Sequence, residues 1–318
     1  MKLCTFEVPT SLGKFRRLGA VSPEGITDLN FAAAHHLANQ RHADALVPPS
    51  LLGLLEGGPL SRRTAEAAMA YLPPELRRGI HDETLLYRWD EIELLTPLPD
   101  ARSLRDFFAF EAHVKRGFEK RSEPMPQEWY EIPVYYQTGH HNLIGSGQDV
   151  LWPRFTEKFD YELELAAIIG RPGRNIKAEN ARDYIAGYTI LNDFSARDIQ
   201  KREMKVRLGP AKGKHWCSGL GPWMVTADEL TDPYNLVMTA RINGDEWSRG
   251  YSGDMHWKFE QMIEFLTQDD TIYPGDIIAS GTVGTGCGLE LDKWVQPGDI
   301  IELEIEHIGV LRNRVVRP

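Results

Sequence analysis

Four acidic residues stand beside apolar segments, where their carboxylates could bind a metal ion. Glu162 and Glu164 lie in "DYELELAAII" (residues 160–169), and a strand would direct both side chains to one face. Asp193 ends the apolar run "YTILND", and Asp106 follows a proline-containing segment. Carboxylates without cysteine or a required histidine are the ligands of a hard cation, so we expect Mg²⁺, with Mn²⁺ or Ca²⁺ as alternatives.

Each of these acids also has an ordinary structural interpretation. Two glutamates spaced by two residues are typical of the solvated face of an amphipathic strand. Asp193 precedes the expected helix "SARDIQKRE" and could cap its first turn. Spacing alone leaves these alternatives open.

Composition excludes several classes of protein. The chain has 318 residues, 42% of them hydrophobic, with a formal net charge of −10, which disfavours nucleic acid as a partner. No apolar run reaches the roughly 20 residues of a membrane span. The first residues lack the pattern of a secretory signal, and Cys4, Cys217 and Cys287 form no CxxC pair, so we expect a cytoplasmic protein. Basic residues between Arg197 and Lys214 suit a small anionic substrate.

The elements that position these residues divide the chain into two predicted domains. Residues 1–98 are expected to form a small α+β domain, with one helix behind Asp28 and another in "SRRTAEAAMAYL". Residues 99–318 contain many strand patterns separated by Gly, Pro, Asn or Asp, and Asn243-Gly244 predicts a hairpin turn. The fold class is therefore α+β and mostly β, as a rolled or sandwiched domain. Helices are expected around residues 107–121, 194–204 and 257–267.

Several motifs occur together in the order that is typical of one enzyme family. They are "ELE" (162–164), "NDFSARDIQ" (192–200), "LGPAKGKHWCSGLGPWMV" (208–225) and "SGTVGTG" (280–286). Over residues 100–318 the chain thereby resembles the fumarylacetoacetate hydrolase family. The resemblance implies a fumarylacetoacetase-like β-sandwich roll, a bound divalent metal and a homodimer.

The resemblance also implies a role for each candidate residue. The metal ligands would be Asp106, Glu162, Glu164 and Asp193. His113, seven residues after Asp106, would activate water, and Glu290 in "GLEL" would orient it. The His-x-x-Glu pair of smaller members is absent, because Arg116 follows His113 by three residues. Lys214 would stabilise a developing oxyanion, and the substrate would contact Arg197, Gln200, Tyr136 and Thr282.

Two residues depart from the pattern of the diketone hydrolases. Phe108 and Met204 stand where those enzymes carry tyrosines, and the segment "QKREMKVRLGPAKGK" is one residue longer. These changes argue against fumarylacetoacetate itself as the substrate.

The leading expectation is a metal-dependent hydrolase that cleaves a carbon–carbon bond in a 2,4-diketo acid, in the catabolism of aromatic or related compounds. The alternative is an isomerase, tautomerase or decarboxylase of a 2-oxo or 2-hydroxy-diene dioic acid at the same metal site. A third hypothesis is a non-catalytic protein with a structural Ca²⁺.

Overall fold

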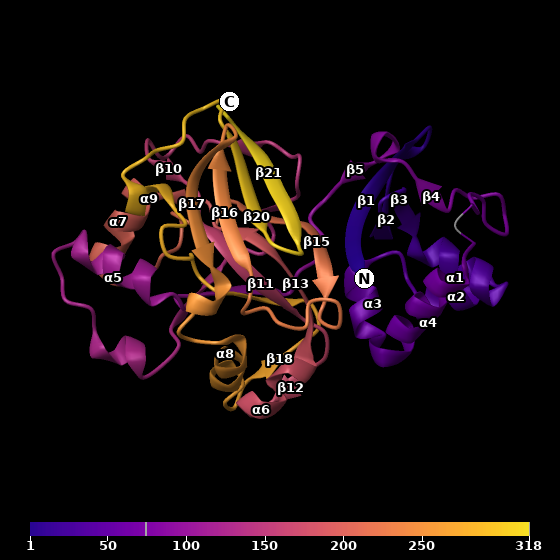
Figure 1. Ribbon diagram of the computed structural model, residues 1–318, viewed down its shortest axis with the longest axis horizontal. Helices are drawn as coiled ribbons and strands as arrows, with labels where there is room; N and C mark the ends of the chain where they lie inside the picture. Colours follow the sequence, from indigo (N-terminus) through magenta and orange to yellow (C-terminus); the bar gives the residue numbers. More distant parts are fainter. Residues whose placement is uncertain (74, 318) are drawn as a thin grey trace.

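Two β-sheets of unequal size organise the chain (Figure 1). A computed structural model describes residues 1–73 and 75–317. The larger, 12-stranded sheet contains, in order, β4 (Leu86–Tyr87), β3 (Gly25–Asp28), β2 (Gly13–Ser22), β1 (Lys2–Thr10), β15 (Ser218–Thr226), β13 (Ile185–Asn192), β11 (Leu163–Ile169), β19 (Asp276–Ala279), β6 (Ser103–Phe107) and β7 (Tyr135–Thr138). In addition, β5 (Glu93–Leu94) pairs with β1, and β8 (Leu143–Ile144) pairs with β15.

The smaller sheet has five strands, and two short strand pairs lie outside both sheets. The strand order of the five-stranded sheet is β17 (Asp245–Tyr251), β16 (Val237–Ile242), β20 (Ile300–Ile305), β21 (Gly309–Val316) and β9 (Val150–Leu151). The short pairs are β10 (Phe159–Asp160) with β14 (Ser195–Ala196), and β12 (Gly173–Arg174) with β18 (Thr271–Ile272).

Helices surround the sheets in two groups. The N-terminal group contains α1 (Leu29–Leu37), α2 (Gln40–Leu46), α3 (Leu51–Glu56) and α4 (Gly58–Tyr71), which gather on one side of the molecule beside β1–β3 (Figure 1). The other group contains α5 (Glu111–Glu119), α6 (Ala178–Ala181), α7 (Arg197–Val206), α8 (Phe259–Leu266) and α9 (Gly288–Leu291). Short 3₁₀ helices span η1 (Trp89–Glu91), η2 (Gln127–Tyr130), η3 (Arg182–Tyr184) and η4 (Ser252–Asp254).

Strand β11 separates two apolar cores, because alternate side chains of a strand point to opposite faces. Leu163, Leu165, Ala167 and Ile169 pack in a cluster with buried residues of β16, β20 and β21. The intervening Ala166 and Ile168 pack with buried residues of α1, α3 and α4. Glu164 lies on the same face of β11 as Ala166 and Ile168, so the face that carries the carboxylate is also the face that packs against the N-terminal helices.

The mixed, mostly β fold expected from the sequence is confirmed. Asn243 and Gly244 have φ values of 54° and 87° and connect β16 to β17, as expected for a two-residue hairpin turn. The helix expected around residues 107–121 starts only at Glu111, because residues 103–107 form β6 in parallel pairing with β19. Asp106 therefore lies on a strand.

The N-terminal strands extend the same sheet that carries the predicted site. β1 pairs antiparallel with β15, with Lys2 opposite Val225 and Leu3 opposite Met224. The domain boundary between residues 98 and 99 stays a prediction. Among residues 1–73 and 75–317, no helix is long and apolar enough to cross a membrane.

Candidate metal centre and acid–base pair

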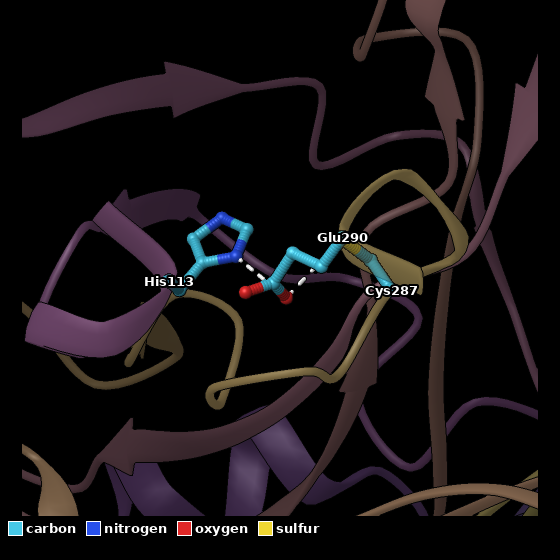
Figure 2. A group of neighbouring side chains, drawn as sticks. All are labelled: His113, Cys287 and Glu290. Carbon is cyan, nitrogen blue, oxygen red and sulfur yellow. Dashed lines mark hydrogen bonds and ion pairs between the residues drawn. The ribbon is translucent and has the colours of Figure 1, made fainter. Parts of the chain in front are cut away.

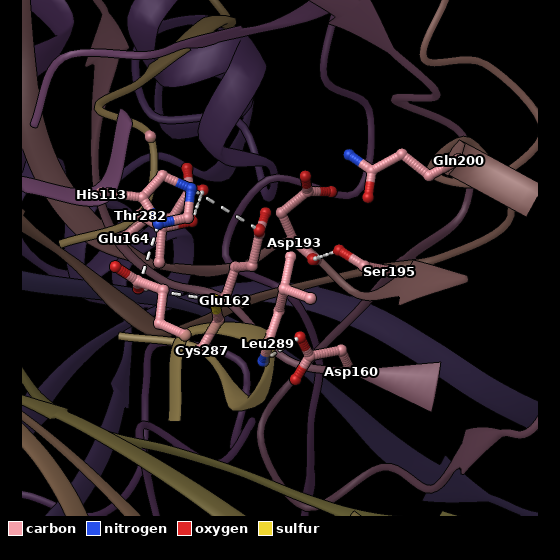
Figure 3. Close-up of polar contacts among 12 residues, drawn as sticks. His113, Asp160, Glu162, Glu164, Asp193, Ser195, Gln200, Thr282, Cys287 and Leu289 are labelled. Carbon is pink, nitrogen blue, oxygen red and sulfur yellow. Dashed lines mark hydrogen bonds and ion pairs between the residues drawn. The ribbon is translucent and has the colours of Figure 1, made fainter. Parts of the chain in front are cut away.

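Three of the predicted metal ligands meet at one end of the large sheet. Figure 3 shows two of them, Glu164 and Asp193. Asp106 lies in β6, Glu164 in β11, and Asp193 directly follows β13. β11 pairs with β13 on one side and with β19 on the other, and β6 follows β19 in the sheet. Each of the three acids offers a carboxylate oxygen, and these oxygens lie within 4.8 Å of one another.

The ordinary structural interpretations of these acids are excluded. Glu162 and Glu164 are only 4% and 0% exposed, so they do not form a solvated strand face. Asp193 does not cap α7, because Ala196 occupies the N-cap position and no side chain caps that helix.

The environment of the three carboxylates suits a divalent cation. Asp106 Oδ1, Glu164 Oε2 and Asp193 Oδ1 are buried and accept no hydrogen bond within the described part of the chain. Burial raises the pKa of Asp106 and of Glu164 well above their ordinary values, and the neighbouring carboxylates raise both further. Burial also raises the pKa of Asp193. A divalent ion would offset this repulsion and use the unpaired oxygens, so the residues fit such an ion.

Glu162, the fourth predicted ligand, is placed among cations instead. Its Oε1 accepts a hydrogen bond from Arg197 Nη2 at 2.7 Å, and its Oε2 accepts one from Lys214 Nζ at 2.5 Å. Burial alone would raise the pKa of Glu162, but Arg197 and Lys214 lower it far below its ordinary value. The Lys214 ammonium also donates to Asp193 Oδ2. Lys214 thus joins Glu162 to the three-carboxylate group, and metal ligation by Glu162 stays a prediction.

The buried ammonium of Lys214 keeps its charge. Burial would lower the pKa of Lys214, but Asp193 and Glu162 raise it above its ordinary value. A fixed positive charge therefore lies beside the carboxylates, where it could stabilise negative charge on a bound oxygen.

His113 and Glu290 form a pair (Figure 2), and His113 also lies close to Glu162. Nδ1 of His113, on α5, lies 3.0 Å from Oε2 of Glu290, on α9. Nε2 of His113 lies 4.0 Å from Oε1 of Glu162. The thiol of Cys287 donates to Glu290 Oε2 at 3.5 Å. Within the described residues the close approach of Nδ1 to Glu290 does not have hydrogen-bond geometry. A proton on Nδ1 would face Glu290 and would leave Nε2 as the nitrogen that can take a proton.

The four residues expected to bind substrate also gather here. The Tyr136 hydroxyl donates to Asp193 Oδ2, and Thr282 Oγ1 donates to Glu164 Oε1 at 3.4 Å. Arg197 is 7% exposed, and its Nη1 donates to Gln200 Oε1 at 3.1 Å. The Arg197 guanidinium is thus engaged by acceptors of the protein itself. Contact of these four residues with a substrate stays a prediction.

The two positions that depart from the diketone hydrolases differ in their surroundings. The ring of Phe108 meets the His113 imidazole edge-on, with 5.3 Å between the centroids. Met204 is exposed on α7. The phenylalanine at position 108, where the diketone hydrolases carry a tyrosine, therefore places an apolar ring beside the acid–base pair.

Sequence reasoning missed Asp160 and Cys287. Asp160 is fully buried and accepts hydrogen bonds from Arg197 and from the first residues of α9. A signal for it exists in the sequence, because Asp160, Glu162 and Glu164 follow one another at intervals of two residues. Cys287 carries no such signal.

An open cavity of about 510 Å³ reaches Glu290 from the outside. Its walls come from α5, from the β17 region and from the loop after β19. They include Phe110, Lys115, Arg116, Arg249, Gly284 and Thr285.

Comparison with known sequences identifies the family. The profile described as "Fumarylacetoacetate (FAA) hydrolase C-terminal" matches residues 103–316. The human protein named oxaloacetate tautomerase FAHD2A, mitochondrial, is 30% identical over 327 residues, covering 99% of this chain and 92% of the relative. Oxaloacetate tautomerase YisK of Bacillus subtilis (strain 168) is 33% identical over 241 residues, covering 73% and 76%.

Solved structures share the whole fold. Maleylpyruvate hydrolase from Sphingobium sp. SYK-6, in complex with manganese(II) and pyruvate, has a TM-score of 0.71 at 24% identity, covering 100% of this chain and 99% of that one. A 5-carboxymethyl-2-hydroxymuconate delta-isomerase from Mycobacterium smegmatis has a TM-score of 0.67 at 23% identity, covering both chains fully. The sequence match over most of the chain, on a site built from the motifs of that family, shows that the chain belongs to the fumarylacetoacetate hydrolase family.

Proposed function

We propose that the chain is a divalent-metal-dependent tautomerase or isomerase of a small 2-oxo dioic acid, with oxaloacetate as the first candidate and Mg²⁺ as the first candidate metal. Relatives named oxaloacetate tautomerases match at about 30% identity over nearly the whole chain, and they support this reaction above the hydrolysis that the sequence favoured. The chain is an enzyme of its family under either proposal.

A single observation carries the proposal: the His113 imidazole lies between Glu290 and Glu162, and Lys214 joins Glu162 to a buried group of three carboxylates. Asp106, Glu164 and Asp193 would hold the metal, which when bound supplies a Lewis acid that polarises a carbonyl oxygen. His113 Nε2 would take a proton from the carbon next to that carbonyl, and the imidazolium would then give the proton to the enolate oxygen; the reverse transfer forms the keto acid. Tautomerisation needs only this movement of a proton between carbon and oxygen, so no water has to attack.

The charges of Lys214 and Glu290 also suit tautomerisation. The carbonyl oxygen gains negative charge when the neighbouring carbon loses its proton, and the ammonium of Lys214 lies in the same buried group. Glu290 would stabilise the imidazolium while His113 holds the proton.

Hydrolysis of a carbon–carbon bond in an acylpyruvate-like acid is the second candidate. Two observations favour it. Glu290 approaches His113 from α9, as the resemblance to the carbon–carbon hydrolases implied, and the cavity of about 510 Å³ beside Glu290 has room for an acyl chain. In that reaction His113 would activate water.

One panel separates the candidates. Oxaloacetate, acylpyruvates and hydroxy-diene dioates are incubated with the protein and Mg²⁺ or Mn²⁺, and the products are followed by NMR. Tautomerase activity would appear as faster enol–keto interconversion of oxaloacetate, whereas hydrolysis would place ¹⁸O from labelled water in the released acid. Loss of carbon dioxide would instead indicate a decarboxylase.

The variant His113→Ala tests the acid–base assignment. It should lose about 10²- to 10⁴-fold in turnover while Mn²⁺ binding is retained. Undiminished turnover would remove His113 from the reaction. Metal binding without turnover of any substrate by the unaltered protein would favour the structural-ion hypothesis.

A homodimer in the cytoplasm, without nucleic acid or membrane partners, also remains a proposal. The mass in solution, measured by light scattering, tests the dimer.

A further inference from the structure

Asp160 is a buried carboxylate that neither the metal centre nor the acid–base pair uses directly. It ends β10 and is 0% exposed. Its Oδ2 accepts from Arg197 Nε at 2.8 Å and from the backbone N–H of Leu289 at 2.9 Å, and its Oδ1 accepts from the N–H of Gly288 at 2.8 Å. One side chain therefore holds both a buried guanidinium and the start of α9. Figure 3 shows Asp160 beside Leu289.

These two partners of Asp160 contact different parts of the candidate site: Arg197 contacts Glu162, and α9 carries the partner of His113. Arg197 Nη2 donates to Glu162 Oε1 at 2.7 Å. α9 carries Glu290, whose Oε2 lies 3.0 Å from His113 Nδ1. His113 Nε2 in turn lies 4.0 Å from Glu162 Oε1. The contacts thus form a closed ring from Glu162 through Arg197, Asp160, α9, Glu290 and His113 back to Glu162.

The position of α9 depends on this ring. A helix of four residues cannot hold its own conformation in water, so its place is set by tertiary contacts. The approach to Asp160 is also close. A Cβ added at Gly288 would lie 2.6 Å from Asp160 Oδ1 and 2.2 Å from the carbonyl oxygen of Lys293. Glycine is therefore required where α9 meets the carboxylate.

We propose that Asp160 is a positioning residue that fixes where the His113 imidazole stands relative to Glu162, by holding Arg197 and the start of α9 with one carboxylate. This inference rests on the proposed acid–base role of His113. Without the Asp160 charge, the first two N–H groups of α9 lose their carboxylate acceptor, and α9 is held by its remaining backbone contacts at Gly286, Cys287 and Lys293. Glu290 can then move, and the imidazole loses its fixed position. Displacement of a reacting group by about 1 Å can cost on the order of 10²-fold in rate.

The chain offers a matched control in Asp28. That carboxylate is also 0% exposed, also pairs with an arginine, through Arg17 Nε at 2.5 Å, and also accepts from a helix N–H, that of Phe31 at 3.0 Å. Its partners belong to the N-terminal strands and helices. D28N and D160N therefore remove equivalent buried charges from two parts of the molecule.

The experiment compares D160N, D28N and the unaltered protein, each loaded with Mn²⁺. Both variants should unfold at a lower temperature. Only D160N should lower kcat, by about 10- to 100-fold, as for other residues that orient a catalytic group, while KM and Mn²⁺ affinity change little. Amide hydrogen exchange at Gly288 and Leu289 should accelerate in D160N and stay unchanged in D28N.

A second variant keeps the test decisive if D160N fails to fold. G288A changes no charge, but its Cβ would collide with the Lys293 carbonyl oxygen and with Asp160 Oδ1, so the start of α9 must move relative to both. It should therefore reproduce both the kcat loss and the faster exchange in α9. Equal kcat losses in D28N and D160N, or unchanged kcat and exchange in D160N, would overturn the proposal. If the unaltered protein turns over no substrate, the proposed function fails, whereas the exchange measurement still tests the tie between Asp160 and α9.

Discussion

Glu162 and Glu164 are two residues apart on one face of the chain, yet their environments are opposite. Glu162 lies between Arg197 and Lys214, which lower its pKa far below the ordinary value. Glu164 lies against Asp106 and Asp193, and its pKa is raised well above the ordinary value by burial and by these carboxylates. The protein places two cations against Glu162, whereas the three acids around Glu164 share only Lys214, which pairs with Asp193, among the residues that the structure describes.

The difference shows how a repeated residue can serve two purposes. An acid that already has buried cationic partners is neutralised in place. An acid among other buried acids is stable as an anion only when a cation arrives from solution. We therefore expect Glu164 to contribute most of the metal affinity. We expect Glu162 to keep the residues around the metal in position.

The largest expected effect is on metal binding. Glu164→Gln should abolish the heat of Mn²⁺ binding in isothermal titration, at concentrations that saturate the unaltered protein, because it removes one of three acids that share the ion. Glu162→Gln should weaken binding by about tenfold at most, an effect in the range of residues that orient ligands. Equal losses would mean that Glu162 leaves Arg197 and Lys214 to ligate the metal, as the sequence predicted.

The next effect concerns the buried cation. Lys214→Met should destabilise the metal-free protein by about 3 kcal/mol, because it leaves Asp193 without a buried cationic partner and Glu162 with Arg197 alone. Denaturant unfolding in the presence of chelator measures this loss. The control is Lys212→Met, which changes a neighbouring solvent-exposed lysine. A Lys214 variant as stable as the control would show that the ammonium does not offset the two acids.

Metal addition should stabilise the unaltered protein by a predictable amount. At a free Mn²⁺ concentration of 100 times Kd, the gain is about 2.7 kcal/mol if the unfolded chain does not bind the ion. The melting temperature, followed along a Mn²⁺ titration, measures it. The Glu164→Gln variant should show no such rise, and a rise of equal size would locate the ion elsewhere.

The smallest effect is expected at Thr282. Thr282→Val removes the hydroxyl that donates to Glu164 Oε1 at 3.4 Å and keeps the shape of the side chain. The expected weakening of Mn²⁺ binding corresponds to about 0.5–1.5 kcal/mol, the usual value of one hydrogen bond. Calorimetry beside the unaltered protein measures it. A change in kcat alone, with unchanged Mn²⁺ affinity, would instead support the predicted contact with substrate.

Most residues of the candidate site were indicated by the resemblance to the family and not by spacing alone. Asp106 and His113, seven residues apart, and the Glu-x-Glu pair became candidates because the family motifs occur in order along the chain. What the motifs could not supply is the partner of each charge. That Lys214 bridges Glu162 and Asp193, separated from it by 52 and 21 residues, depends on how distant strands meet.

The fold class could be predicted from the sequence, but the pairing of distant strands could not. Glycine and proline positions separate the strands, and Asn243-Gly244 fixes one hairpin. The start of α5 was placed too early, because the apolar residues of 103–110 suit a strand or a helix equally, and pairing of β6 with β19 decides the matter. The pairing of β1 with β15 joins segments more than 200 residues apart, which no local pattern indicates.

This last pairing means that the N-terminal strands protect the catalytic sheet from other chains. β15 pairs with β13 on one side and with β1 over Met224 and Val225 on the other. A chain cut before residue 99 would leave those backbone groups unpaired, and would uncover Ala166, Ile168 and Leu191, which pack against residues of α1, α3 and α4. Unpaired strand edges beside apolar surface are sites of aggregation. The catalytic part, produced alone, should therefore associate edge to edge rather than stay dispersed.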